Sequence, residues 1–358
     1  MIRCVLADAH LDLAYNAVRG REVTRPAHEQ TPDKEGIPTV GLPDLQAGNV
    51  RLICATIFCE PEADPPTGFR TPEQAHEAAQ RQLAWYQARE AEGVVRFVRS
   101  GRELPREDEN GRWRMEDGGR AEASRSLPQS SILHPLSSIL LMEGADPLRT
   151  PADVRTWFDA GLRIVGLAWR KARYAGGTGN PGPITLEGLE LVKELDRFGF
   201  IHDASHLAEL SFWQLLDVSG GPVIASHSNC RSIVPTDRQL SDDMIRAIVK
   251  RGGVIGINFF DKFLLSPAEY ARKRRATLVD VVHHVKRICD LAGSDKHVGL
   301  GTDMDGGLGR DEIPQEIVTA ADLPKVADAL SAAGFGDDAV CRTMGGNWLA
   351  YFRAHLPG

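Results

Sequence analysis

The chain alternates short apolar runs with helix-forming segments from its beginning to its end, and this alternation limits the folds open to it. The apolar runs are β-branched or leucine-rich with little polar alternation, as expected of parallel strands buried on both faces. The predicted strands are Arg3–Ala7, Arg51–Phe58, Ser138–Met142, Arg163–Ala168, Gly199–Asp203, Val223–Ser226, Gly253–Phe259 and His297–Gly301. About eight strand–helix units predict an α/β fold, a single (β/α)₈ TIM barrel domain over residues 1–358.

Helix-start signals between these runs support the same architecture. Thr71-Pro72-Glu73-Gln74 offers an N-cap, a proline in the first turn and a capping-box glutamine, and Thr150–Asp153 and Ser266–Glu269 repeat the pattern. A doubly wound sheet is the alternative. It fits less well because the candidate site residues follow strands spread over the whole chain, which a closed barrel gathers more easily.

Two segments depart from the alternation. Residues 101–130 form a polar excursion between the second helix and the third strand, with a hairpin predicted around Asn110-Gly111. Gly176–Gly182 is glycine-rich but lacks the Gly-Lys-Ser/Thr ending of a phosphate loop, so we expect a strand-to-helix loop there.

Charge and composition exclude several classes of partner. The formal net charge is −7, and the run Arg272–Arg275 is too short to track a phosphate backbone, so we expect a solvated helix face there and no nucleic-acid partner. No apolar stretch approaches the roughly 18 residues of a membrane span. Six scattered cysteines without CxxC spacing indicate reduced thiols. With the predicted first strand at the start in place of a signal sequence, we expect a cytoplasmic protein that binds no membrane.

Imidazoles and carboxylates stand at the ends of the predicted strands, and they are the candidate metal ligands: His10, Asp12, Glu143, His206 and His227. This mixture of donors suits a borderline-hard divalent ion. Each residue also has a structural alternative, because an HxD pair can cap a turn, a buried glutamate can pair with a loop arginine, and a lone histidine can be a hydrogen-bonded core residue. Their recurrence at successive strand ends favours a shared metal site.

The last predicted strand leads into Asp303 and Asp305. An aspartate beside a metal-activated water can act as a general acid and base, which is the role predicted for Asp303. Asp305 precedes glycine, so a turn-forming role suits it better.

Together, the ordered segments resemble the membrane (renal) dipeptidase family of zinc peptidases, peptidase family M19, within the amidohydrolase superfamily of metal-dependent barrels. The segments that carry the resemblance are ADAHLD, LMEG, GLRIVGLAW, FIHDASH, PVIASHSNCR, RGGVIGINF, HVGLGTDMDG and GGNW. They extend from residue 7 to residue 348 and so cover nearly the whole chain.

The resemblance implies a zinc-dependent dipeptidase that attacks the amide bond with a metal-bridging hydroxide. It implies two divalent ions, Zn²⁺ by preference, with His10, Asp12 and Glu143 on one ion and Glu143, His206 and His227 on the other. It further implies that Arg238 binds the carboxylate of a dipeptide-like substrate and that Asp303 carries the proton. Oligomeric state is left open, although barrels of this family are often homodimers.

One position departs from the family. Its fourth strand usually ends in a Leu-Thr-His phrase whose histidine contacts the scissile carbonyl, whereas this chain has Leu167-Ala168-Trp169. Tryptophan offers one N–H donor and no titratable group, so Trp169 is a candidate substrate contact and ordinary L,L-dipeptides are expected to be poor substrates. The residues considered as replacements for the histidine are Arg170, Lys171, Arg173, Tyr174 and His202.

Two other functions remain open from the sequence. The same metals on the same scaffold can hydrolyse a lactone, an N-acyl amino acid or a phosphoester, because fold alone does not fix the reaction. The change at Trp169 also allows a metal-binding homologue with impaired catalysis.

Overall fold

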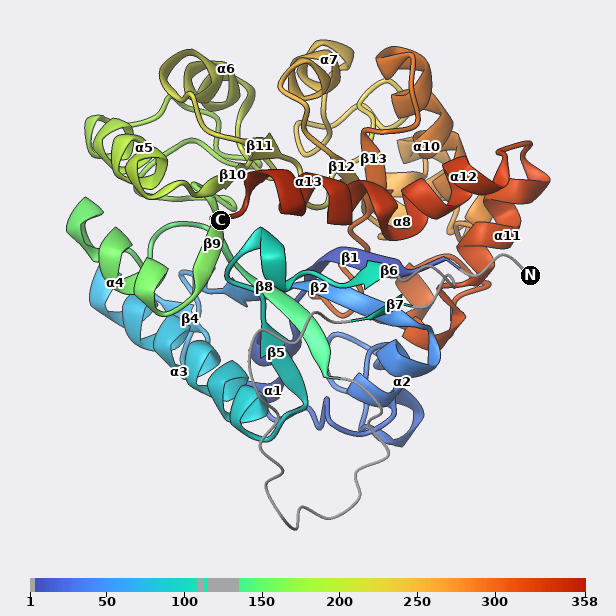
Figure 1. Cartoon of the computed structure of the whole chain (residues 1–358), viewed down its shortest axis with the longest axis horizontal. Coiled ribbons are helices and arrows are strands. Elements are labelled where there is room, and N and C mark those ends of the chain that lie inside the picture. The colour runs from blue at the N-terminus through green and yellow to red at the C-terminus, as the bar shows by residue number, and fades with distance from the viewer. Residues whose placement is uncertain (1–3, 108–112, 115–134) are drawn as a thin grey trace.

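Parallel strands close into a barrel at the centre of the molecule (Figure 1). The computed structural model describes residues 4–107, 113–114 and 135–358. The barrel strands are β1 (Leu6–Leu11), β2 (Val50–Phe58), β8 (Leu136–Glu143), β9 (Leu162–Gly166), β10 (Ile201–Asp203), β11 (Val223–Ile224), β12 (Ile255–Ile257) and β13 (Val298–Leu300). Their order is β11-β10-β9-β8-β2-β1-β13-β12, and a parallel bridge between Ala225 and Ile255 joins the two ends. The predicted (β/α)₈ barrel is therefore confirmed, and the doubly wound alternative is wrong.

Glycine permits the close approach of strands where the barrel closes. A Cβ atom on Gly256 would lie 1.9 Å from the carbonyl oxygen of Ser226, and one on Gly301 would lie 1.8 Å from the same oxygen. No larger residue fits at these two positions without moving the strands. Gly256 and Gly301 thereby let β12 and the end of β13 approach Ser226, which precedes a candidate metal ligand.

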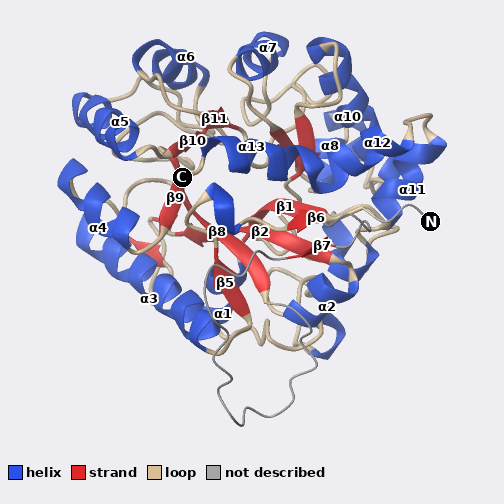
Figure 2. Cartoon of the chain, in the orientation of Figure 1, coloured by secondary structure: helices blue, strands red, loops and turns tan. Residues whose placement is uncertain are grey.

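Helices surround the barrel (Figure 2). They are α1 (Leu13–Val18), α2 (Leu42–Ala47), α3 (Pro72–Ala91), α4 (Val154–Asp159), α5 (Leu186–Phe198), α6 (Glu209–Val218), α7 (Asp242–Lys250), α8 (Asp261–Leu264), α9 (Pro267–Ala271), α10 (Leu278–Ala292), α11 (Lys325–Ala332), α12 (Asp337–Cys341) and α13 (Asn347–His355). Their inner faces and the outward faces of the strands form a continuous apolar core.

Of the three predicted helix starts, the one at Ser266 is confirmed in detail, and the one at Thr71 is confirmed as an N-cap without the predicted capping box, because the Gln74 side chain accepts from the backbone N–H of Arg70. The Thr71 side chain accepts a hydrogen bond from the backbone N–H of Gln74, and Ser266 forms a capping box with Glu269. Thr150 begins a 3₁₀ turn (Pro151–Asp153) and makes no side-chain cap, so that prediction is wrong in detail. The reason is that the Asp153 carboxylate accepts a hydrogen bond from the backbone N–H of Arg149 instead.

The helix α13 lies across the barrel (Figure 1). Its Trp348, Leu349 and Phe352 pack with inward-facing residues near the strand starts, among them Val5 and Val254. The indole N–H of Trp348 donates to the carbonyl oxygen of Leu300 at 2.9 Å, which satisfies the one polar atom of this buried ring. The C-terminal helix thus fills the amino-terminal end of the barrel, opposite to the predicted site.

The predicted polar excursion contains short elements of its own. Strand β5 (Val95–Phe97) pairs in parallel with β8, and β6 (Arg106–Glu107) pairs antiparallel with β7 (Trp113–Arg114). The antiparallel pairing agrees with the predicted hairpin, although its expected turn at Asn110-Gly111 lies outside the described residues. A second small pair, β3 (Glu60–Pro61) and β4 (Gly68–Phe69), follows β2.

Two expectations from composition are wrong. Cys4 and Cys341 form a disulfide across a sequence separation of 337 residues, because α12 ends beside the start of β1; spacing along the chain gives no sign of this pairing. Cys54, Cys59, Cys230 and Cys289 are free thiols, as predicted.

The basic run Arg272–Arg275 follows the end of α9 and forms a loop, not a helix face, and its last residue donates to backbone carbonyls of Arg310 and Ile313. In the part of the chain that the structure describes, every helix is too short or too polar to span a bilayer.

Candidate metal centre and active site

The predicted ligands all lie at the carboxyl ends of the barrel strands. His10 is the penultimate residue of β1, Asp12 follows that strand, and Glu143 is the last residue of β8. His206 and His227 follow β10 and β11. Each of them is buried or nearly so, with side-chain exposures of 9% or less. The barrel therefore brings together, in one place, five residues that span 218 positions from 10 to 227.

Glu143 lies between the histidines. One of its carboxylate oxygens, Oε1, is 3.2 Å from His206 Nε2 and 3.1 Å from His227 Nε2. Those two nitrogens are 3.0 Å apart. The other carboxylate oxygen, Oε2, is 3.9 Å from His10 Nε2. Glu143 is thus within reach of imidazoles on both sides, as a bridging ligand has to be.

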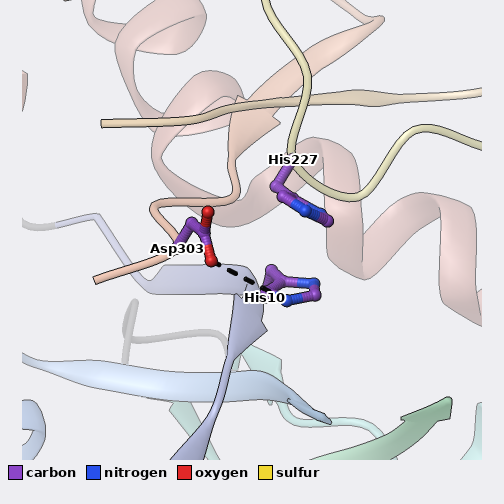
Figure 3. Close-up of side chains that lie close together, drawn as sticks. All are labelled: His10, His227 and Asp303. Atoms are coloured by element: carbon purple, nitrogen blue, oxygen red, sulfur yellow. Dashed lines mark ion pairs between the residues drawn. The ribbon is translucent and has the colours of Figure 1, made fainter. Parts of the chain in front are cut away.

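His10 faces a second group of carboxylates. Its Nε2 is 3.7 Å from Asp12 Oδ2 and 3.9 Å from Asp303 Oδ1. Figure 3 shows His10, His227 and Asp303 converging, with the ion pair between His10 and Asp303 marked. The rings of His10 and His227 are 3.7 Å apart between centroids, so the two halves of the cluster are contiguous.

Buried atoms without partners indicate that this cluster is built for cations. His10 Nε2, Asp12 Oδ1 and Glu143 Oε1 are buried and have no hydrogen-bond partner among the described residues. An unpaired buried charge is costly, and coordination to a metal is one way to remove that cost. Two sets of donors are close enough to share an ion, Glu143–His206–His227 and His10–His227–Asp303. The residues present therefore fit divalent metal ions.

Burial and mutual repulsion strongly perturb the protonation of the site. Burial raises the pKa of Glu143 to about 8 and that of Asp303 to about 7, against the lowering effect of His10. Burial alone would lower the pKa of His10, but the surrounding carboxylates, Glu143 foremost, raise it to about 10. Burial lowers the pKa of His206 and of His227. Without metal, the site therefore retains protons on His10, Glu143 and Asp303 near neutral pH.

A serine hydroxyl orients the candidate ligand His227. Ser226 Oγ donates to Asp203 Oδ2, so its lone pairs accept from His227 Nδ1–H at 2.7 Å. Asp203 Oδ1 in turn accepts the backbone N–H groups of Ser226 and Ser205 at 2.8 and 3.0 Å. With its proton on Nδ1, His227 presents the Nε2 lone pair to a metal.

The glycine-rich loop performs the same task for His206. Thr178 Oγ1, within Gly176–Gly182, lies 3.1 Å from His206 Nδ1 and donates to the backbone carbonyl of His206. A Cβ atom on Gly177 would lie 2.4 Å from the carbonyl oxygen of Arg170, so this loop needs glycine to pack where it does. The segment is the predicted strand-to-helix loop, and its role is to hold a candidate ligand.

The backbone itself is strained at the site. His206 has φ 64° and Asp303 has φ 59°, in the left-handed region that side chains other than glycine seldom adopt. Such conformations persist where the surrounding structure fixes them, and they cluster at functional sites. Asp303 is held by Asn258, whose Nδ2 donates to Oδ2 at 2.9 Å, which leaves Oδ1 directed toward His10.

A cavity of about 320 Å³ opens over the metal centre. Its lining combines ligands, aromatic rings and charged residues: Asp12, Tyr15, Lys34, Glu35, Phe58, Glu60, Glu143, Trp169, His206, His227, Phe260, Phe263, Asp303, Gly306, Gly307 and Leu308. A larger hollow of about 570 Å³ lies beside α3 and contains none of the ligands. The smaller cavity is the candidate active site because Asp303 and four of the five candidate metal ligands line it.

Trp169 lies in the wall of this cavity, 6.0 Å from His206 and 5.0 Å from Phe58 between ring centroids. Of the residues considered as replacements for the missing histidine, none lines the cavity. His202 is bonded to Asp196, Lys171 pairs with Glu62, and Tyr174 is bonded to the carbonyl of Leu148. Arg173 donates to backbone carbonyls, and Arg170 lies over the Trp169 ring.

Arg238 is buried and is not one of the residues that line the cavity. Its Nη1 donates to Ser228 Oγ at 3.0 Å and its Nη2 to the carbonyl oxygen of His227 at 2.6 Å. Its buried Nε has no partner. Asp305 lies in a turn, as predicted, and its carboxylate also accepts the backbone N–H groups of Thr39 and Val40 and pairs with Arg21, which the sequence did not predict.

The residues that orient the candidate ligands were not predicted from the sequence. Asp203, Ser226 and Asn258 were not singled out, although each is a polar residue in or beside an apolar strand. That position was the available signal: Asp203 occupies a buried strand three residues before a candidate ligand, where a carboxylate needs a partner.

A closed parallel barrel with imidazoles and carboxylates at its carboxyl rim defines a metal-dependent barrel hydrolase. The family model for membrane dipeptidases, peptidase family M19, matches residues 119–355. The chain belongs to this family, as the sequence predicted, and metal-dependent dipeptide hydrolysis is the activity class of the family.

Curated relatives agree with this assignment. The chain is 32% identical to an uncharacterized protein from the pqqA 5′ region of Klebsiella pneumoniae, over 55% of this chain and 73% of that protein. It is 29% identical to an uncharacterized dipeptidase of Schizosaccharomyces pombe and 31% identical to a dipeptidase of Claviceps purpurea, over 61% of this chain in each case. It spans about half the length of these two fungal relatives, 53% and 50%.

Solved structures share the fold over the whole chain. The dipeptidase AC, a metallo peptidase of family M19, superposes with a TM-score of 0.78 at 24% identity and covers 99% of both chains. A metallo peptidase of Rhodobacter sphaeroides, solved with a phosphinate mimic of the dipeptide L-Ala-D-Ala, gives a TM-score of 0.77 at 24% identity and covers 99% of this chain and 100% of that one.

Replacing Asp203 with asparagine is expected to weaken metal binding about 10- to 100-fold. Asparagine Nδ2 would donate toward Ser226 Oγ and compete with His227 for its lone pairs, so His227 would lose its fixed tautomer. Metal titration followed by calorimetry measures the change. Asp243→Asn, whose side chain is 80% exposed on α7, is the matched control. Equal affinities in both variants would show that the Asp203–Ser226 contact does not orient the ligand.

The stabilising effect of metal is expected to grow as pH rises from 6 to 8. In the folded, metal-free protein, the pKa values of Glu143 and Asp303 are raised to about 8 and about 7. These two groups therefore contribute their full share to the free energy of unfolding below the ordinary carboxyl pKa. That contribution is lost as pH rises through 7 to 8. Metal must displace these protons, so it binds more readily at higher pH. The difference in Tm between metal-loaded and metal-free protein measures this, and a difference that shrinks toward pH 8 would contradict the account.

Proposed function

We propose that the protein is a dipeptidase with two zinc ions at the carboxyl rim of its barrel. The observation that carries the proposal is Glu143, a buried carboxylate that approaches His206 and His227 with one oxygen and His10 with the other. We assign His10, Asp12 and Glu143 to one ion and Glu143, His206 and His227 to the other. Asp303 lies as close to His10 as Glu143 does, at 3.9 Å, and would be an additional carboxylate near the first ion.

The ions, when bound, supply an acidified water as nucleophile and polarise the scissile carbonyl. The chain's own residues provide the rest. The imidazoles and carboxylates fix the positions of the ions, while the surrounding aromatic side chains of the cavity limit the access of bulk water and strengthen electrostatic interactions inside it.

Asp303 is proposed to move the proton. Its Oδ2 is held by Asn258, its Oδ1 faces the ligands, and burial raises its pKa to about 7. A carboxyl group with a pKa near the working pH can both accept the proton of the attacking water and return it to the leaving amine. We therefore assign Asp303 as the general base and acid.

Arg238 is proposed to bind the substrate's carboxylate. It is a buried cation whose charge, like that of His10, lowers the pKa of both Asp303 and Glu143, and among the described residues its Nε has no hydrogen-bond partner. Its two Nη groups bond Ser228 and His227, so binding a carboxylate through the fork requires these bonds to be exchanged. The proposal therefore includes a rearrangement of Arg238 when substrate binds.

Trp169 is proposed to shape substrate preference. Its indole stands in the cavity wall beside His206, where it offers an apolar face and one N–H donor. The imidazoles that line the cavity, His206 and His227, are proposed metal ligands, so among the lining residues the Trp169 N–H would be the group that takes the place of the missing histidine as a donor to the scissile carbonyl. The relative bound to a mimic of L-Ala-D-Ala makes an L,D-dipeptide the first substrate to test.

A cytoplasmic location and a homodimer remain predictions. The Cys4–Cys341 disulfide weighs against the cytoplasm, because disulfides persist mainly in oxidising compartments.

A panel of substrates tests the proposed function. The zinc-loaded enzyme is expected to hydrolyse L,D-dipeptides and to turn over ordinary L,L-dipeptides poorly, because the carbonyl-contacting histidine is replaced by Trp169. N-acyl amino acids, lactones and phosphoesters in the same panel distinguish other reactions on this scaffold. Metal content, measured in parallel, separates an inactive holoenzyme from an unloaded one. Hydrolysis of a lactone or phosphoester without any dipeptide would refute the proposal.

Asp303→Asn is expected to lower kcat by about 10²- to 10⁴-fold while Tm and metal content stay near those of the native protein. Asparagine keeps the shape and the contact with Asn258 but cannot hold the proton. Asp305→Asn is an unsuitable control because that carboxylate anchors residues 39–40, so Asp243→Asn serves again. Full activity in Asp303→Asn would exclude the proton-carrying role.

A further inference from the structure

One carboxylate in the cavity wall, that of Glu60, lies outside the proposed metal centre and forms no ion pair with the residues that the structure describes. The acidic residues of the lining are Asp12, Glu35, Glu60, Glu143 and Asp303. Three of them are members of the metal centre described above. Glu35 is paired with Arg19. Within the described residues, no lysine, arginine or histidine lies within ion-pair distance of Glu60.

The position of Glu60 is fixed from both its backbone and its side chain. Its backbone N–H donates to the carbonyl oxygen of Thr67 at 3.1 Å, within the small β3–β4 sheet that follows β2. Its Oε2 accepts a hydrogen bond from the hydroxyl of the buried Tyr15 at 3.3 Å. Tyr15 lies on α1, directly after the strand that carries His10. The carboxylate is therefore held in place in the wall, with its second oxygen left for a ligand.

An aromatic wall connects Glu60 with the metal centre. Ring centroids are 5.2 Å apart between Tyr15 and Phe58, 5.0 Å between Phe58 and Trp169, and 6.0 Å between Trp169 and His206. A substrate lying along these rings would have its scissile bond at the ions and one end beside Glu60. Apolar walls also reduce the screening of charge, so an anion there attracts a cation more strongly than it would at the surface.

We propose that Glu60 binds a primary ammonium group of the substrate, on the residue that precedes the scissile bond. This inference rests on the proposed function. An ammonium donates three hydrogen bonds, and a carboxylate is its strongest common acceptor. Lys34 also lines the cavity, but it is exposed, and within the described residues no ion pair joins it to Glu60. The ammonium is either the α-amino group of a dipeptide or the side chain of a lysine residue, and the experiment distinguishes these sources.

The test measures Kd of zinc-loaded enzyme for three phosphinate dipeptide mimics, which bind without being cleaved. They are the L-Ala-D-Ala mimic with a free amine, its N-acetyl derivative, and an N-acetyl-L-Lys-D-Ala mimic. Glu60→Gln is expected to weaken at least one ammonium-bearing mimic by roughly tenfold or more, as loss of a charge-assisted hydrogen bond does. Its affinity for the N-acetyl-L-Ala-D-Ala mimic is expected to stay the same.

Matched variants separate charge recognition from structure. Glu62→Gln lies in the same segment, but its side chain is 70% exposed and pairs with Lys171 outside the cavity, so it should leave all three affinities unchanged. Tyr15→Phe keeps the ring and removes the hydroxyl that holds Glu60, so it should weaken the same mimic as Glu60→Gln does, to a smaller extent. Tm of each variant confirms folding.

Two results would overturn the inference. If Glu60→Gln weakens all three mimics equally, Glu60 supports the wall without recognising a charge. If it weakens none, Glu60 takes no part in binding. If Glu60→Gln raises Kd for the free-amine mimic, the group bound by Glu60 is the α-amino group. If it raises Kd for the lysine mimic alone, the bound group is the lysine side chain. Failure of the native holoenzyme to cleave any dipeptide would be a separate result, which contradicts the proposed function and leaves these affinities measurable.

Discussion

The contact on which the site depends is that of one buried carboxylate with three imidazoles. Glu143 ends a strand whose residues are all buried, so its charge has no solvent to stabilise it. Its oxygens lie 3.1 to 3.9 Å from the Nε2 atoms of His206, His227 and His10. In the absence of a metal, burial raises the pKa of this carboxyl group to about 8. The proposed divalent ions would remove this conflict, because they would bring positive charge to the unpaired oxygen and nitrogen donors of the site.

The closed barrel brings these four side chains close enough to make this contact. Residues 10, 143, 206 and 227 follow different strands, and only closure of the sheet brings their side chains to one rim. Gly256 and Gly301 allow the strands to approach Ser226 at the closing seam, and Ser226 in turn orients His227. The geometry of a metal ligand therefore depends on the absence of side chains on two neighbouring strands. A sequence in which either glycine is replaced has to move the seam and, with it, the ligand.

Much of this organisation was predictable from the sequence because it rests on local patterns. Buried parallel strands are continuous apolar runs, and polar residues at their ends are conspicuous, so His10, Glu143 and His227 stood out before any contact was known. The disulfide and the Asp203–Ser226 contact were not predictable, because each depends on the distance between residues that are remote in sequence. The sequence identifies Trp169 as a departure from the family, but it does not predict which residues lie beside Trp169 in the cavity wall. The residues considered as replacements for the missing histidine have partners elsewhere, and Glu60 with Tyr15, found only in three dimensions, completes the same wall.

The central claim is that Glu143 bridges two metal ions, and anomalous diffraction from crystals of the zinc-loaded protein tests it most directly. The account predicts two anomalous peaks about 3.5–4 Å apart, with one oxygen of Glu143 ligating each ion. It also predicts His10 on one ion and both His206 and His227 on the other. A single peak, or two peaks of which Glu143 touches only one, would contradict it.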